Sequence, residues 1–246
     1  MPELLHTSNL TKRFGAVTAV RDISISVDEG EIRGVIGPNG SGKSTLFNCI
    51  AGSLRPSAGR IQFAGENVTT TMEGARARRG LVRCFQEPQV FAGLTVAANI
   101  RMALDARGRR VRTSVGDLPD GVDGILDLVG LLDKAGEIAS VLPYGSLRRL
   151  TAGLAIAVRP RLLLLDEPAA GLTVEDRVDI ARMFRRLNRA GITLMVIEHD
   201  MSFLMSLAQR ISVLNAGSLI CEGTPDEVQA NAEVAAAYLG ALAGGS

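Results

Sequence analysis

Hydrophobic and polar residues alternate along the first part of the chain. Leu4–Phe14 and Ile23–Val27 are predicted to be strands, and the second alternates between apolar and polar residues. Ile61–Ala64 is predicted to be a further strand of this region. Because alternation is typical of a sheet with one buried and one solvated face, we expect an N-terminal antiparallel sheet.

Continuous apolar runs farther along the chain predict strands that are covered on both faces. Ile32–Ile36, Leu162–Leu165 and Ile192–Ile197 are such runs. Between the last two lies Val174–Ala190, a predicted amphipathic helix that ends before Gly191. Strands of this kind alternating with helices favour an α/β fold with a parallel sheet.

Residues 94–153 differ from the rest of the chain in their pattern of apolar and polar residues, and this pattern predicts a helical insert. Val122–Leu132 spaces its apolar residues at helical intervals. Residues 105–120 are rich in Gly, Arg and Asp, and we expect a loop or a frayed helix end there. Toward the C-terminus, Asn215-Ala216-Gly217 is a hairpin signal between two short strands. Pro225–Leu239 is predicted to be one closing helix that Thr224 caps.

The composition excludes several classes of function. The 246 residues suffice for one large domain, or for a domain with a subdomain. A net charge of +1 provides no global attraction to nucleic acid or anionic lipid. The three cysteines are scattered, which argues against a zinc site and a disulfide scaffold. No apolar window approaches the roughly 18 residues of a membrane span, and the start of the chain does not resemble a signal segment.

An arginine-rich stretch precedes the predicted insert. We expect its arginines to lie on a solvated helix and on the strand after it, since such residues are seldom buried. A nucleic-acid patch would need more basic residues, with aromatic residues among them. The arginines concerned are Arg76, Arg78, Arg79 and Arg83.

A phosphate-binding motif lies between the predicted strand Ile32–Ile36 and an apolar helical segment. Its pattern is G-x-x-x-x-G-K-S, and that strand–loop–helix context is what the motif requires. Glycines let several main-chain N–H groups point at one anion, and the helix N-terminus adds its positive dipole end. Lys43 provides a cation for the phosphates, and Ser44 a hydroxyl for Mg²⁺. The motif comprises Gly37, Pro38, Asn39, Gly40, Ser41, Gly42, Lys43, Ser44 and Thr45.

Polar residues follow two of the predicted buried strands. Leu162–Leu165 ends in Asp166 and Glu167, and Ile192–Ile197 is followed by Glu198 and His199. In parallel α/β sheets, ligands bind beyond the carboxyl ends of the strands. We therefore expect Asp166 to lie near Ser44 and to hold Mg²⁺ through water. Glu167 is predicted to accept a proton from an attacking water molecule, and His199 to bond a γ-phosphate oxygen.

These parts and their order resemble the ATP-binding subunits of ABC transporters, over nearly the whole chain. The resemblance implies a single domain with a P-loop NTPase core over residues 1–87 and 159–246. It also implies an N-terminal antiparallel β subdomain and a helical subdomain inserted at 88–158. Phe14 would stack on adenine, with a place in the core as the alternative. Gln86 would touch Mg²⁺ and the attacking water.

The resemblance is weakest at the family's signature segment. The commonest pattern is Leu-Ser-Gly-Gly-Gln, and this chain has Leu142-Pro143-Tyr144-Gly145-Ser146. In the family this helix start caps the γ-phosphate bound by the opposite subunit, so Leu142, Tyr144, Gly145 and Ser146 are implied as nucleotide contacts. Pro143 offers neither a hydroxyl nor an N–H group, but Gly145 and Ser146 still offer amides.

Leu-Pro-Tyr-Gly resembles one branch in particular, the ATPases of branched-chain amino-acid importers and their urea and amide relatives. That branch usually continues with Gln and then Gln or Asp, where this chain has Ser146-Leu147. Its later Glu-Ile-Ala-Arg becomes Thr151–Leu154 here. These departures imply slower turnover, or reliance on a partner with an intact signature.

The resemblance implies an ATPase that uses ATP and Mg²⁺ to power an importer. Two such subunits would pair, as a homodimer or a heterodimer, on integral-membrane permease subunits at the cytoplasmic face of the membrane. A substrate-binding protein would take part indirectly, and no nucleic acid is expected. Two alternatives stay open at this stage: a soluble ABC-type ATPase of DNA repair or translation, and a regulatory subunit that has lost hydrolysis.

Overall fold

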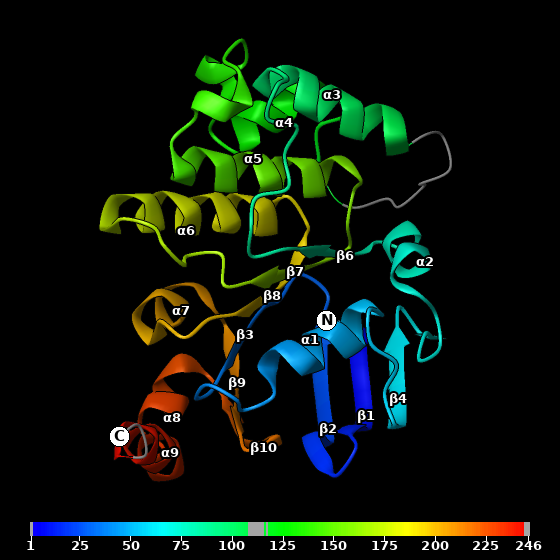
Figure 1. The fold of residues 1–246 in the computed structure, drawn as a ribbon, viewed down its shortest axis with the longest axis vertical. Helices are drawn as coiled ribbons and strands as arrows, with labels where there is room; N and C mark the ends of the chain where they lie inside the picture. The colour runs from blue at the N-terminus through cyan, green and yellow to red at the C-terminus, as the bar shows by residue number, and fades with distance from the viewer. Residues whose placement is uncertain (1, 108–115, 117, 244–246) are drawn as a thin grey trace. The chain divides into compact units, whose positions relative to one another are not determined.

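The computed structural model describes residues 2–107, 116 and 118–243, drawn in colour in Figure 1. The chain forms two compact units. The first comprises Met1–Arg76 and Met195–Ser246, and the second comprises Ala77–Leu194. The boundary falls within strand β8 (Thr193–Ile197). The sequence predicted a different division, into a P-loop core and a helical subdomain inserted at 88–158, and that division stays a prediction.

An antiparallel sheet occupies the N-terminal part of the first unit. It contains β1 (Glu3–Phe14), β2 (Val17–Asp28), β4 (Ala58–Phe63) and β5 (Glu66–Asn67), in the order β2-β1-β4-β5. β1 pairs with both β2 and β4, and all pairs are antiparallel. The alternating pattern of the sequence predicted this sheet.

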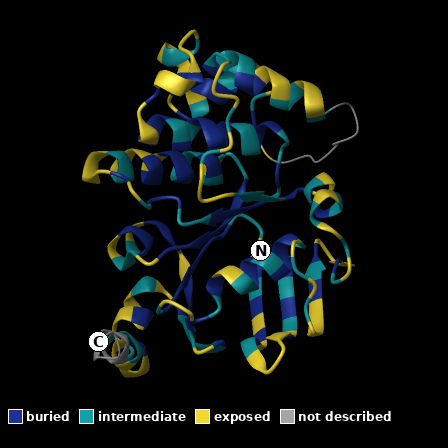
Figure 2. Ribbon diagram, in the orientation of Figure 1, coloured by how far each residue is buried: buried dark blue, intermediate teal, exposed yellow. Residues whose placement is uncertain are grey.

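A second set of strands in the first unit leads to the phosphate-binding motif. β3 (Ile32–Ile36) pairs in parallel with β9 (Arg210–Asn215), and β9 pairs with β10 (Ser218–Gly223) in a hairpin. All of β3 is buried, as Figure 2 shows, and helix α1 (Lys43–Ala51) follows the motif. Ala216 and Gly217 turn the hairpin with φ values of 45° and 83°.

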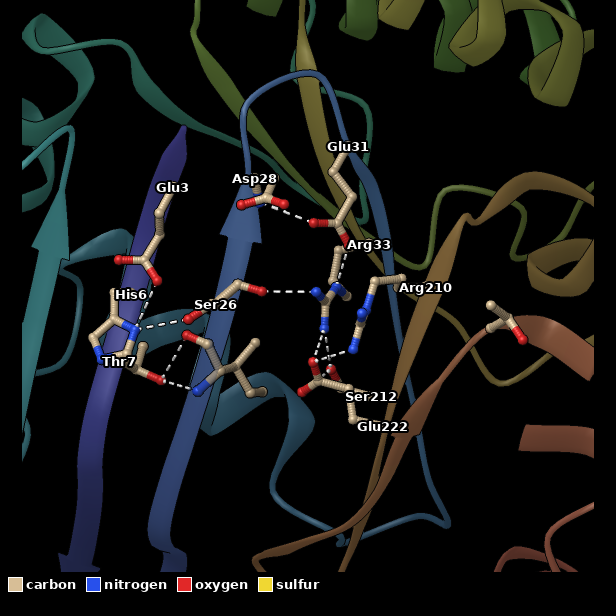
Figure 3. A network of polar contacts seen from close by, with 12 residues as sticks. Glu3, His6, Thr7, Ser26, Asp28, Glu31, Arg33, Arg210, Ser212 and Glu222 are labelled. Carbon is tan, nitrogen blue, oxygen red and sulfur yellow. Dashed lines mark hydrogen bonds and ion pairs between the residues drawn. The ribbon is translucent and has the colours of Figure 1, made fainter. Parts of the chain in front are cut away.

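A buried arginine fixes the neighbourhood of β3. Arg33 is 2% exposed, and its guanidinium donates to Glu31, to Ser212 and to the Ser26 carbonyl, with Glu222 at 2.7 Å, as Figure 3 shows. Burial alone lowers its pKa, but the bonds and charges of the two glutamates outweigh burial and raise the pKa above its usual value. The strand that feeds the motif is therefore held by charge as well as by apolar packing.

The C-terminal region contains three helices: α7 (Met201–Leu207), α8 (Pro225–Gln229) and α9 (Ala232–Ala243). The expectation of one closing helix was wrong, because Asn231 interrupts it. The Asn231 side chain accepts bonds from the amides of Glu233 and Val234, and so it caps a new helix. Thr224 caps α8 as predicted.

The expectation for the arginine-rich stretch was wrong for Arg76. This residue lies on α2 (Glu73–Arg78) and is only 1% exposed, whereas Arg78 and Arg79 are exposed. Its guanidinium donates to four carbonyls, those of Thr69, Thr71, Cys49 and Ile50. The last two belong to α1, whose final carbonyls have no partner within the helix. Arg76 thus supplies donors that the end of α1 lacks.

The second unit combines two parallel strands with a group of helices. β6 (Leu81–Cys84) pairs in parallel with β7 (Leu162–Asp166). The helices are α3 (Val96–Arg107), α4 (Val122–Leu128), α5 (Tyr144–Ala157) and α6 (Val174–Arg189), with short 3-10 helices at Leu132–Lys134 and Ala139–Val141. Helices α3, α4 and α5 pack on one another (Figure 1).

Helix α4 ends earlier than the apolar spacing predicted. It stops at Leu128, and Gly130 follows with a φ of 70° that breaks the helix. Most of the loop expected within residues 105–120 lies outside the described residues. Among the helices that the structure does describe, none has both the length and the apolar character needed to cross a bilayer.

Candidate functional site

The phosphate-binding motif forms a tight loop between β3 and α1. Gly37, Gly40 and Gly42 have φ values of 154°, 77° and 99°, which residues with a side chain rarely adopt. A Cβ on Gly37 would collide with the Leu214 carbonyl oxygen, and one on Gly42 with that of Ala19. The close approach of main chain therefore requires glycine at both positions.

The loop holds its own cation and contains a hydroxyl that lacks a protein partner. The Lys43 ammonium donates to the carbonyls of Gly37 and Pro38 at 2.7 and 3.0 Å, and the residue is 7% exposed. The Ser41 hydroxyl is buried and makes no hydrogen bond to protein. Asn39, Gly40 and Ser44 are exposed. A buried unpaired hydroxyl and a cation in a glycine loop fit a bound phosphate.

His199 belongs to the same unit as the loop. The Glu198 amide donates to the Val35 carbonyl on β3, two residues before Gly37. This bond places the chain just before His199 beside the strand that enters the loop. The His199 side chain is 60% exposed, and Asp200 next to it caps α7. His199 is thus available to a ligand, while its contact with a γ-phosphate oxygen stays a prediction.

Phe14 lies at the end of β1 and is 48% exposed, with the Lys12 ammonium 5.0 Å from the ring centre. This exposure excludes the alternative that Phe14 is a core residue. An exposed aromatic face is what stacking on a purine needs, and the stacking itself stays a prediction.

Two carboxylates mark the end of β7 in the second unit. Asp166 forms an ion pair with Arg83 of β6 at 2.7 Å, and both side chains are 11% exposed. The Arg83 guanidinium also lies over the Phe85 ring, 5.0 Å from its centre. The expectation that Arg83 is a solvated residue was therefore wrong. The Asp166 carboxylate offers oxygen atoms, which are the ligands that a divalent cation such as Mg²⁺ prefers.

Glu167 has an unusual backbone and a side-chain partner. Its φ of 45° lies in the left-handed region, which is uncommon for a residue with a side chain. Gln86 donates to its carboxylate at 3.1 Å. Gln86 and Asp166 line a cleft of about 380 Å³. The structure thus brings together the predicted residues Asp166, Glu167 and Gln86.

The predicted signature residues lie at the start of α5. Leu142 and Gly145 are buried, Tyr144 is 42% exposed, and Pro143 precedes the first helical residue. A Cβ on Gly145 would meet the Asp176 carboxylate of α6, which would have to shift to make room. Ser146 is buried, and its hydroxyl accepts a bond from Arg149 at 3.2 Å. The hydroxyl of Ser146 is therefore already engaged within the chain.

Sequence reasoning missed three residues around the carboxylates and the start of α5: Arg83, Arg148 and Asp176. Arg83 pairs with Asp166, Arg148 bonds the main chain of the Glu167 turn, and Asp176 lies against Gly145. Each contact joins elements that are distant in sequence. The only local signal was the place of Arg83 on a strand three residues before Gln86.

The sequence matches models of known protein families. A family model described as ABC transporter matches residues 20–170. The chain belongs to the ABC transporter family. A second model, described as branched-chain amino acid ATP-binding cassette transporter, matches residues 218–243 at the C-terminal end of this ABC chain.

Curated relatives of this ABC transporter chain match it along nearly its full length. The high-affinity branched-chain amino acid transport ATP-binding protein BraF of Pseudomonas aeruginosa is 35% identical, over 96% of this chain and 98% of its own. LivG of Salmonella typhimurium, which has the same description, is 35% identical with the same coverage. A solved structure titled as the ADP conformation of MJ1267, an ATP-binding cassette of an ABC transporter, has a TM-score of 0.86 and 30% identity, over 98% of this chain and 100% of its own.

Proposed function

We propose that this chain is the ATP-hydrolysing motor of an ABC importer. One observation carries the proposal. The chain has a complete phosphate loop and the carboxylate pair Asp166 and Glu167, and it matches a transport ATP-binding protein over 96% of its length. The family membership argues for transport and against the reading as a soluble ATPase of DNA repair or translation.

The phosphate loop supplies the grip on ATP. We expect its main-chain amides and the N-terminus of α1 to face the phosphates. Lys43 is a buried cation inside the loop. We propose that Ser44, Asp166 and Gln86 hold Mg²⁺, whose preferred ligands are oxygen atoms and whose remaining ligands would be phosphate and water. When bound, Mg²⁺ neutralises charge on the β- and γ-phosphates.

Glu167 is proposed to drive the chemical step. Its carboxylate takes a proton from water as the water oxygen bonds the γ-phosphorus, and the bond from that phosphorus to the bridging oxygen breaks to leave ADP and phosphate. Gln86 donates a hydrogen bond to the Glu167 carboxylate, and we propose that this bond orients the carboxylate toward the attacking water. His199 would bond a γ-phosphate oxygen, and Phe14 would stack on adenine.

The start of α5 is proposed to serve a second copy or a sister ATPase. Leu142, Tyr144, Gly145 and Ser146 would border the nucleotide that the partner holds, mainly through the amides of Gly145 and Ser146. Because the Ser146 hydroxyl is engaged by Arg149, we expect it to contribute little to this contact.

Permease subunits are proposed as the other partners, at the cytoplasmic face of the membrane. The segment around Gln86 exposes two aromatic residues, Phe85 and Phe91, at 45% and 53%. A neighbouring cavity of about 920 Å³ is lined by parts of β6, α3 and α5. Exposed apolar surface of this kind suits a protein partner. BraF and LivG are described as branched-chain amino acid transport proteins, and we propose amino acids of this class as the solute.

Replacing the proposed base tests this function. Glu167→Gln removes the proton acceptor but keeps the size of the side chain, so ATP hydrolysis should fall by at least about a hundredfold while ATP still binds. Phosphate release and nucleotide binding by the purified chain measure the two effects. If the variant hydrolyses ATP as fast as the parent, Glu167 is not the base. If the parent itself binds ATP without hydrolysing it, the chain is a regulatory subunit instead.

A further inference from the structure

Arg148 is a buried cation near the start of α5 for which the proposed chemistry has no role. It is 6% exposed and lies four residues after Tyr144, so the two side chains share one face of the helix. The guanidinium lies over the Tyr144 ring, 5.1 Å from its centre. Such a contact between a cation and an aromatic face favours this position of the guanidinium.

The guanidinium is directed at the turn that follows β7. One of its nitrogens, Nη2, donates to the carbonyls of Glu167 and Ala170, both at 3.3 Å. The Ala170 amide also donates to the Glu167 carbonyl, at 3.2 Å, and closes the turn. Arg148 therefore binds both ends of a four-residue turn whose first residue carries the proposed catalytic carboxylate.

This turn needs external support. Glu167 adopts a φ of 45°, a conformation that persists only where the surroundings hold it. The Tyr144 ring also lies near this turn, because a Cβ built on Gly171 would come 3.5 Å from it. The start of α5 thus contacts the turn at Glu167, at Ala170 and beside Gly171.

We propose that Arg148 is a positioning residue for ATP hydrolysis, which fixes the backbone of the Glu167 turn and thereby aims the Glu167 carboxylate. The inference rests on the proposed function, since it assigns the hydrolytic role to Glu167. Arg148 acts through Glu167 and touches no nucleotide. Arg148 also links two proposed parts of the site. One is the start of α5, which would face the nucleotide held by the partner, and the other is the Glu167 carboxylate, which would act on the nucleotide held by this chain.

Two substitutions of Arg148 distinguish a role in positioning the Glu167 carboxylate from a role in packing alone. Arg148→Met keeps an apolar side chain of similar length. It removes the two hydrogen bonds to the Glu167 and Ala170 carbonyls and the contact between the guanidinium cation and the Tyr144 ring. Arg148→Lys keeps the charge but cannot present the planar fork of an arginine. The matched control is Arg186→Met on α6, because Arg186 also donates to a main-chain carbonyl of this unit, that of Asp127 at 2.9 Å, away from the Glu167 turn.

Steady-state ATP hydrolysis, with kcat and KM resolved, is measured for the full-length parent and for these variants. All are assayed well below the melting temperature of the least stable protein. A misaimed base costs between about tenfold and a hundredfold in rate. We expect Arg148→Met to lose that much in kcat with KM within about twofold of the parent. Arg148→Lys should recover part of kcat, and Arg186→Met should keep the parental kcat.

Three results would overturn the proposal: an Arg148→Met kcat within about twofold of the parent, equal losses in kcat for Arg148→Met and Arg186→Met, or a change confined to KM. If the methionine variant does not fold, a lysine variant with parental kcat overturns it equally. Glu167→Gln, assayed in parallel, separates the two claims. If it hydrolyses ATP normally, the proposed function fails; if it stalls while Arg148→Met is normal, only the positioning role fails.

Discussion

Buried cations that bind main-chain carbonyls recur in this protein. Lys43 donates to the carbonyls of Gly37 and Pro38, Arg76 to four carbonyls, and Arg148 to two. Each cation replaces the water that these oxygens lose on burial. Removing one side chain therefore leaves several acceptors unsatisfied, which costs more than the loss of a single surface bond.

Arg76→Met should lower the free energy of unfolding by about 3 kcal/mol, because several buried carbonyls lose a charged donor. Urea unfolding followed by circular dichroism measures the change. Arg78→Met is the control, since Arg78 lies on the same helix but is exposed, and its replacement should cost less than about 0.5 kcal/mol. Equal effects of the two variants would contradict the structural role given to Arg76.

The sequence could predict the site residues that belong to short local motifs. The loop from Gly37 to Thr45 and the pair Asp166-Glu167 are recognisable because a strand directly precedes each. Arg76 and Arg83 were wrongly expected on a solvated surface, since their partners lie on other elements. A local sequence pattern reflects only that arginine is usually exposed. It does not show which carbonyl or carboxylate, distant in sequence, the arginine will bind in the fold.

At the scale of elements, helix ends decide where the chain changes direction. Thr224 and Glu227 form a reciprocal capping box at the start of α8, with the Thr224 amide donating to Glu227 at 2.7 Å. Asn231 then starts α9. The apolar pattern of 225–239 is continuous across this break, so periodicity predicted one helix. The strands were easier to predict, because their alternation or continuous burial is a property of each strand alone.

Thr224→Ala should destabilise the protein by about 1 kcal/mol at pH 7, since an N-terminal amide of α8 loses its acceptor. Thermal or urea unfolding measures this, and Thr224→Ser, which keeps the hydroxyl, should match the parent. A loss for the serine variant as large as for alanine would show that packing of the methyl group, and not the cap, is what matters.

The capping box also predicts a dependence on pH. Hydrogen bonds from Thr224 lower the pKa of Glu227 below its usual value of 4.5. The ionised carboxylate therefore contributes stability above pH 4.5, and that contribution disappears as the pH falls through the lowered pKa. The difference in stability between the parent and Glu227→Gln should shrink on acidification below pH 4.5. A difference that is constant between pH 7 and pH 3 would contradict the assignment.

At the scale of the whole molecule, the proposed chemistry draws on both compact units. The phosphate loop and His199 belong to the first, and Gln86, Asp166, Glu167 and the start of α5 belong to the second. The order of motifs along the chain predicted the fold class and the family. It could not predict the exact solute, because a motor domain need not touch what its transporter carries.

Pairing of two chains is the expected state with ATP, since the proposed signature contact is made to a partner's nucleotide. Glu167→Gln, which should bind ATP without hydrolysing it, is predicted to shift from 26.0 kDa to twice that mass on adding Mg²⁺ and ATP. Light scattering after size-exclusion chromatography measures the mass, and ADP is the control that should leave the monomer. A variant that stays monomeric with saturating ATP would contradict self-pairing.

The most direct test of the whole account is calorimetric titration of the folded chain with magnesium and ATP. The account predicts saturable binding by the parent, and a Lys43→Ala affinity weaker by about tenfold or more, because a buried charged donor to the phosphates is lost. Circular dichroism confirms that both proteins are folded. No nucleotide uptake by the folded parent, or equal affinity of the two proteins, would contradict the claim that this loop and its lysine hold a triphosphate.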